Sequence, residues 1–176
     1  MIAISFNNRS LFFVLVVIYV VTLLFRVMSK KTDITLKNEL KKIVFGVYCW
    51  MLISCTLLPI LIPPMGSNDV EVNFNIATLF EYPDINIWIC NVVGNILMFM
   101  PLYFCISMNF RRLSGKVMLI ISLLTSVTIE GLQCIENITG LADFTFRITD
   151  INDVVLNVAG GMLGWWIYEK CKKRLK

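Results

Sequence analysis

Hydrophobic residues in this 176-residue chain occur in long blocks separated by short polar segments, and they do not alternate with polar residues. A helix needs about 20 mainly apolar residues to cross the hydrocarbon core of a bilayer, which is roughly 30 Å thick. The blocks therefore predict an all-α fold: a polytopic membrane helical bundle of about five transmembrane helices, surrounded by the lipid bilayer. The five predicted helices comprise residues 11–28, 43–62, 85–108, 117–135 and 153–168.

The first block, residues 11–28, has an alternative interpretation as a cleaved signal peptide. Its apolar stretch is long, Arg9 is the one basic residue before it, and no small-residue cleavage site follows it. Arg26, near its end, is close enough to the membrane interface for its side chain to extend to the lipid head groups. These features favour a retained membrane helix.

Basic residues alternate from one predicted loop to the next. The segments after the first and third helices and the C-terminal tail are basic, whereas residues 65–84 contain four acidic residues and no basic one. Between the fourth and fifth helices, Arg147 is the only basic residue. Because cytoplasmic loops carry the excess of Lys and Arg, this alternation predicts a multi-pass protein of the cell membrane with its N-terminus outside and its C-terminus in the cytoplasm.

Composition removes several classes of function. Hydrophobic residues make up 57% and charged residues 16% of the chain, whereas soluble domains average about 25% charged residues. The net charge of +4 comes from clusters beside the predicted helices and not from a basic face, so we expect no nucleic-acid partner. The chain has no histidine and its six cysteines show no CxxC spacing, so we expect no metal site and no cofactor.

Polar side chains inside the predicted third and fourth helices gather near the outer side of the membrane. Polar groups in a membrane span are costly and often mark a functional site. Asn91 and Asn95 are four residues apart and therefore share one face of the third helix. Glu130 and Gln133 are three residues apart near the outer end of the fourth. We expect asparagine side chains to bridge to Glu130 and Gln133.

A third polar group leads into the fifth helix. Arg147, Asp150, Asp153 and Asn157 follow a 3-3-4 spacing, which would place them on one stripe if the helix begins by Arg147. We expect Arg147 to pair with the two aspartates. Small residues extend this stripe and predict close packing against a neighbouring helix. They are Gly160, Gly161 and Gly164.

These polar residues have a structural and a functional interpretation. Asn, Gln and Glu often hold membrane helices together, with a contribution of about 0.6 kcal/mol per interaction. Three carboxylates, those of Glu130, Asp150 and Asp153, against the one guanidinium of Arg147 are more charge than helix packing requires. The excess predicts either a ligand site for a cationic or amide-rich group or carboxylates that stay partly hydrated. No residue can be assigned a catalytic role from the sequence.

The same motifs resemble the VanZ-like family. That pattern reads N-x3-F-x-P-x-G, then E-x2-Q, then R-x2-D-x2-D-x3-N-x2-G. The chain carries Asn95 to Pro101, Glu130 to Gln133 and Arg147 to Gly160 in this order, with Tyr103 in place of the first glycine. We therefore divide the chain into two N-terminal helices with a basic cytoplasmic loop (1–71), a VanZ-like membrane domain (72–168) and a basic cytoplasmic tail (169–176).

The resemblance implies a small bacterial envelope protein associated with low-level resistance to the glycopeptide antibiotic teicoplanin. On this hypothesis the outer polar residues engage a cell-wall precursor, a glycopeptide or an envelope protein, without catalysis. The alternative is a membrane enzyme that acts on a lipid-linked cell-wall precursor, with two carboxylates as acid and base. A transporter is a third hypothesis, although the chain has neither an internal repeat nor a pair of broken helices.

Overall fold

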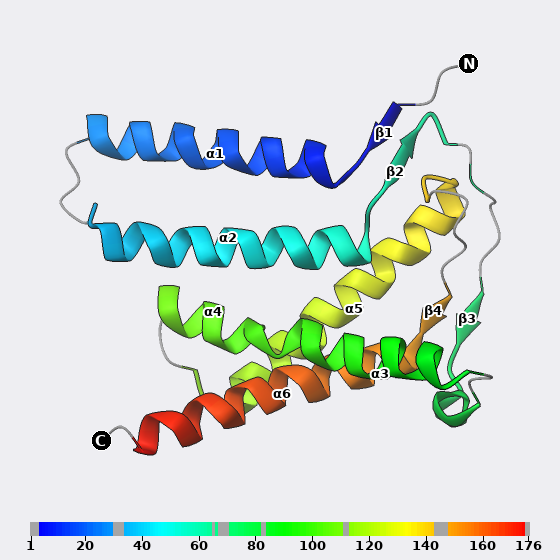
Figure 1. Cartoon of the computed structure of the whole chain (residues 1–176). Helices are drawn as coiled ribbons and strands as arrows, with labels where there is room; N and C mark the ends of the chain where they lie inside the picture. Colours follow the sequence, from blue (N-terminus) through cyan, green and yellow to red (C-terminus); the bar gives the residue numbers. More distant parts are fainter. Residues whose placement is uncertain are drawn as a thin grey trace.

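The computed structural model describes residues 4–29, 34–64, 66, 71–81, 84–110, 113–142 and 148–174. Helices dominate this described part, which confirms the all-α class (Figure 1). Short strands and one 3-10 helix, η1, join them. The α-helices are α1 (Asn8–Met28), α2 (Leu36–Thr56), α3 (Ile85–Phe99), α4 (Pro101–Asn109), α5 (Gly115–Thr139) and α6 (Ile151–Arg174). The other elements are β1 (Ile4–Phe6), β2 (Ile60–Ile62), β3 (Val72–Asn73), η1 (Ile76–Phe80) and β4 (Thr149–Asp150).

The second predicted helix, residues 43–62, is wrong at both ends. Helix α2 begins earlier, at Leu36, where the side chain of Thr35 accepts a hydrogen bond from the backbone N–H of Asn38. It ends at Thr56, because Pro59 has no N–H to donate and restricts the residue before it. The last three residues of the predicted helix form β2, which pairs antiparallel with β1.

The third predicted helix, residues 85–108, is divided in two. Helix α3 ends at Phe99, and α4 begins at Pro101 in the first-turn position where the missing N–H of proline costs nothing. Met100 between them keeps a helical backbone conformation, so the two segments form one interrupted helical span, Ile85–Asn109.

Helix α6 packs against α3, α4 and α5, on the side of the molecule away from α1 (Figure 1). Its glycines permit a close approach. A Cβ atom at Gly160 would overlap the backbone carbonyl of Ile96, and one at Gly164 would overlap that of Met100. Gly161 faces the hydroxyl of Ser122 on α5 in the same way. Contacts this close between backbones are typical of membrane helices that pack through small residues.

In the described part of the chain, three helices are long and apolar enough to cross a membrane: Asn8–Met28, Ile85–Asn109 and Gly115–Thr139. Helix α2 is 21 residues long but begins with several charged side chains, and α6 is 24 residues long but has polar first turns. Helix α1 has no buried residue and packs against α2, so large hydrophobic side chains cover its surface. An exposed apolar surface of this extent is typical of a membrane-facing or protein-binding surface.

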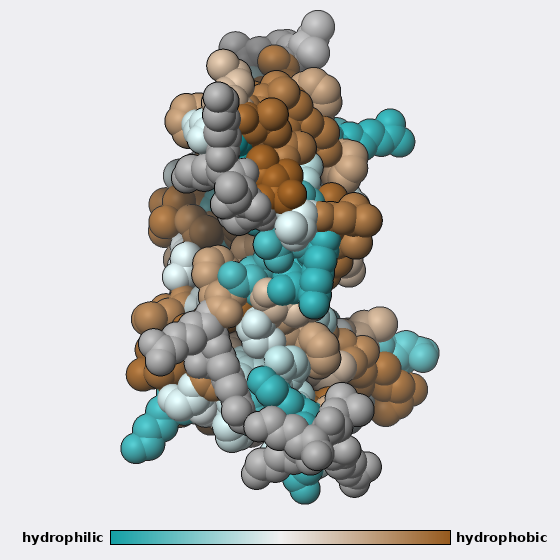
Figure 2. All heavy atoms as spheres, turned by 90° about the vertical axis from the view of Figure 1, so that its left-hand side faces the viewer, coloured by the Kyte–Doolittle hydropathy of each residue, from teal (hydrophilic) through white to brown (hydrophobic). Residues whose placement is uncertain are grey.

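The two ends of the bundle differ in charge. All four strands and η1 lie at one end, here called the strand end (Figure 1). The opposite end, called the basic end, carries most of the described Lys and Arg residues. Figure 2 looks onto this end and shows hydrophilic side chains toward its middle and hydrophobic ones along its flanks. The separation agrees with the positive-inside pattern, although which end faces outside stays a prediction.

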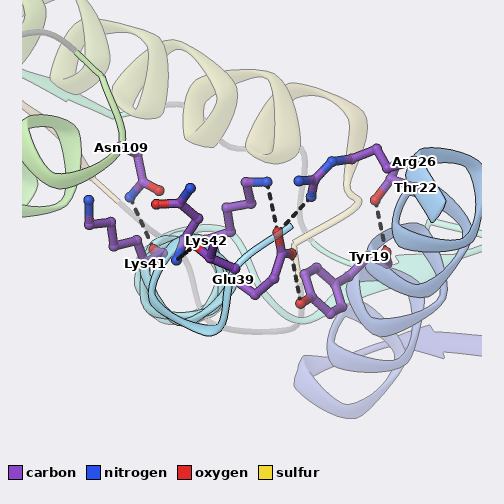
Figure 3. Close-up of polar contacts among 9 residues, drawn as sticks. Tyr19, Thr22, Arg26, Glu39, Lys41, Lys42 and Asn109 are labelled. Carbon is purple, nitrogen blue, oxygen red and sulfur yellow. Dashed lines mark hydrogen bonds and ion pairs between the residues drawn. The ribbon is translucent and has the colours of Figure 1, made fainter. Parts of the chain in front are cut away.

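An ionic cluster at the basic end joins α1 to α2 (Figure 3). Glu39 is only 8% exposed. Its carboxylate accepts hydrogen bonds from Arg26 Nη1 at 2.8 Å, Lys42 Nζ at 3.1 Å and Tyr19 Oη at 3.1 Å. The hydrogen bond from Arg26 is the main cause that holds the pKa of Glu39 below its ordinary value, and burial opposes it.

The glycine contacts of α6 predict a selective effect of one added methyl group. We expect Gly164→Ala to lower the free energy of unfolding by about 1–3 kcal/mol, because the new Cβ overlaps the carbonyl of Met100. Gly131→Ala is the matched control, because a Cβ there meets nothing within 4 Å and alanine favours helix. Thermal unfolding of the purified protein in detergent measures both. Equal stabilities of the two variants would contradict the packing described here.

The Glu39 cluster predicts a pH dependence of stability. Its folded-state pKa is lowered, so the stabilisation is fully present above the ordinary value of 4.5 and is lost as the pH falls through the lowered value. We expect the unfolding temperature of the wild type to fall in that acidic range more steeply than that of Glu39→Gln, which has no carboxyl group to titrate. Parallel curves for the two proteins would remove Glu39 as a source of acid sensitivity.

Candidate functional site

The start of α6 is fixed by Asp150, which lies in β4 and not on the helix. Its Oδ1 accepts a hydrogen bond from the backbone N–H of Asn152 at 2.9 Å, and its Oδ2 accepts one from Asn73 Nδ2 at 3.2 Å. Strand β4 pairs in parallel with β3, with Asn73 opposite Asp150. This is the arrangement of a helix-capping aspartate. The expectation of a single helical stripe starting by Arg147 is therefore wrong, because α6 begins at Ile151.

Arg147 itself lies outside the described residues. Its expected pairing with Asp150 and Asp153 accordingly stays a prediction.

Glu130 ties α5 to the same capping region. Its side chain is buried, and Oε2 accepts a hydrogen bond from the backbone N–H of Asp150 at 3.1 Å. Asn157, on α6, is also buried and donates from Nδ2 to Ser126 Oγ at 2.9 Å. The expected asparagine bridge to Glu130 is not what the structure shows for Asn157, because Ser126 lies directly across the α5–α6 contact.

Three polar residues at the strand end escaped the sequence analysis. Asn152 is 1% exposed, and its Nδ2 donates to Thr78 Oγ1 at 2.8 Å and to the carbonyl of Asn75 at 3.3 Å. These contacts fasten η1 to the first turn of α6. Asn152 lies between the two spaced aspartates in the sequence and so falls off the 3–4 periodicity. The sequence analysis gives the segment before the third helix no role in the site, although its run of Asn and Thr is the available signal.

The remaining polar residues meet in a cavity of about 900 Å³ between α2 and α3, here called the α2–α3 cavity. Asn95 Nδ2 donates to Asp153 Oδ1 at 2.5 Å, which places the carboxylate of α6 in the cavity wall. Gln133 reaches in from α5 and donates from Nε2 to the carbonyl of Thr56 at 2.9 Å. Asn91 lies one turn before Asn95 along α3 and is exposed.

The structure thus separates the predicted site residues into two sets. Glu130, Asp150 and Asn157 make internal hydrogen bonds that fix the end of α6 and its contact with α5. The second set lines the α2–α3 cavity and offers one carboxylate with three amide groups to a ligand. Its members are Asn91, Asn95, Gln133 and Asp153. Side chains of α2 and α3 complete the walls, and they are mainly apolar.

The chemistry of the cavity is that of a binding site with hydrogen-bond acceptors. Of the described residues that line it, none is Lys or Arg. Among the described residues, no group of three Cys, Asp or Glu side chains is placed to hold a metal ion. A cationic or hydrogen-bond-donating group would complement the Asp153 carboxylate and the amide oxygens around it.

The comparisons with known proteins agree on one family. The model of the family described as VanZ/LLP1 matches residues 10–172, and so includes the first two helices, which the sequence motifs do not mark. Over 114 residues the chain is 25% identical to the protein named Protein VanZ from Enterococcus faecium. This match covers 60% of the chain and 66% of that protein, slightly less than two thirds of its length. No solved structure matches the chain.

The two sets of residues predict effects of different size on stability. We expect Asp150→Ala to lower the free energy of unfolding by about 1–2 kcal/mol, because it removes the acceptor that caps α6. Asp153→Ala should change it by less than about 0.5 kcal/mol. The substitution loses the hydrogen bond with Asn95, but it also removes the desolvation penalty of a partly buried carboxylate, and the two effects offset each other. Thermal unfolding in the same detergent compares them. A larger loss for Asp153→Ala than for Asp150→Ala would reverse the assignment.

Proposed function

The chain belongs to the VanZ/LLP1 family, and on that premise we propose that it is a multi-pass protein of the bacterial cell membrane that contributes to teicoplanin resistance. The resistance part follows from the resemblance of its motifs to the VanZ-like family. The membrane part is supported by three helices with the length and composition of membrane spans. The observation that carries the proposal is the α2–α3 cavity, where four residues of those motifs and their surroundings converge.

In the proposed orientation the polar part of the cavity belongs to the outer half of the membrane. Asp153 lies in the first turn of α6, directly after β4 and therefore near the strand end. The strand end is the outer end if the basic end is cytoplasmic. A cell-wall precursor, a glycopeptide or an envelope protein would meet these groups from outside, and binding there would change how the antibiotic reaches its target.

The arrangement favours binding over catalysis. A pair of carboxylates acting as acid and base must both reach the substrate. Asp153 lines the cavity, but Glu130 is not one of the lining residues and its Oε2 is occupied by the backbone N–H of Asp150. Within the described part of the chain, the alternative of an enzyme acting on a lipid-linked precursor therefore has no second carboxylate at this cavity.

The proposal predicts that resistance depends on Asp153. Wild type expressed in a susceptible Gram-positive host without its own copy should raise the inhibitory concentration of teicoplanin by at least one doubling dilution. Asp153→Asn should abolish the increase, because it keeps the shape of the side chain and removes its charge. Glu71→Gln is the matched control, because Glu71 is an exposed acidic residue near the strand end that does not line the cavity.

Membrane levels of the three proteins are compared by immunoblot, so that a loss of resistance is not a loss of protein. An unchanged inhibitory concentration with wild type would refute the resistance role. An increase that survives in Asp153→Asn would refute the role of the cavity while leaving the resistance role in place.

A further inference from the structure

The α2–α3 cavity has apolar walls along most of its length and polar side chains at one end. Its walls along α2 and α3 include Val47, Met51 and Leu97, whose side chains are also exposed on the outside of the bundle. The cavity is therefore open sideways, between two helices, through a mouth lined with hydrophobic side chains. In a membrane protein such a mouth faces the lipid chains, because water does not cover apolar surfaces of this kind.

The polar end is built for one sign of charge. Asp153 supplies a carboxylate, and Asn95 fixes it by donating to Oδ1. The amides of Asn91 and Gln133 lie on the same lining, and none of the described Lys or Arg residues lines the cavity with them. A phosphate group would meet a carboxylate and no cation, which is unfavourable in a site of low dielectric constant. An ammonium group would form a charge-assisted hydrogen bond with the same carboxylate.

We propose that the α2–α3 cavity binds an amine-headed lipid from the membrane, with its aliphatic chain between α2 and α3 and its ammonium group at Asp153. Transfer of the chain from the bilayer into the cavity is nearly neutral, since lipid tails are as apolar as the leucine and valine side chains that replace them. Selectivity therefore resides in the head group. This inference rests on the proposed function in taking the same cavity as the binding site, and it names the chemical class of the ligand.

Photolabelling of the full chain in phosphatidylcholine vesicles tests this assignment. The probe is a long-chain primary amine that carries a diazirine in its chain, and the comparison probes are the alcohol and the phosphate monoester of the same length. Labelled peptides are identified by mass spectrometry. We expect the amine to label cavity-lining residues of α2 and α3 about tenfold more than either comparison probe, as one charge-assisted hydrogen bond allows.

Two variants separate the head-group contact from the fold. Asp153→Asn should bring amine and alcohol labelling to near parity while labelling by the alcohol persists, which shows that the cavity is still formed. Gly94→Leu should reduce labelling by all three probes, because a Cβ at Gly94 points into open space on the cavity lining. Gly131→Leu is its matched control, because that glycine also has open space around it but does not line the cavity.

Several results would overturn the proposal. Equal labelling by the three probes, or an amine preference that survives in Asp153→Asn, would show that the carboxylate does not select the head group. Preferred labelling by the phosphate would indicate an anionic lipid, and crosslinks between two copies at α2 and α3 would indicate a self-association surface. If labelling behaves as expected but Asp153 has no effect on teicoplanin susceptibility, the resistance role fails and the lipid site stands. If susceptibility depends on Asp153 but the amine is not preferred, only the ligand class fails.

Discussion

The close contact between the backbones of α6 and the interrupted span α3–α4 is the constraint on which the rest of the structure depends. Gly160 and Gly164 leave no side chain between α6 and the carbonyls of Ile96 and Met100. In a bilayer no hydrophobic effect drives helices together, so packing of this kind and polar contacts must do so. The contact also fixes Asp153, two turns earlier on α6, beside Asn95 on α3, and thereby sets the polar end of the α2–α3 cavity.

The polar residues at the start of α6 have two roles, because the chain turns there. Some fix the start of the helix, and others line the cavity. Asp150 precedes the helix, and its two carboxylate oxygens accept hydrogen bonds from Asn152 and Asn73. Asp153, in the first turn, points instead to α3 and the cavity. Two aspartates three residues apart thus have different surroundings, and the capping aspartate determines the direction in which the second one points.

Much of the fold could be predicted from the sequence, because the length of an apolar block is a direct consequence of bilayer thickness. The failures have local causes. Residues 57–62 are as apolar as a helix, but Pro59 prevents its continuation, and pairing with β1 depends on a segment more than 50 residues away. The site residues could be predicted from the sequence, because polar side chains inside a membrane span are energetically unfavourable and therefore stand out. Their separation into two sets could not, because Asn73 and Asn95, which donate to Asp150 and Asp153, come near them only in the tertiary structure.

Helix α1 has no buried residue, and its polar contacts with α2 include those of Tyr19 and Arg26 with Glu39 and the hydrogen bond that Trp50 donates to the carbonyl of Asn8. Most of its side chains therefore need only to be apolar. Selection has little to act on at such positions, so one aliphatic residue can replace another over generations without consequence. The outer face of this helix should drift freely among descendants of a common ancestor, while Tyr19 and Arg26, which hold the carboxylate of Glu39, should change slowly.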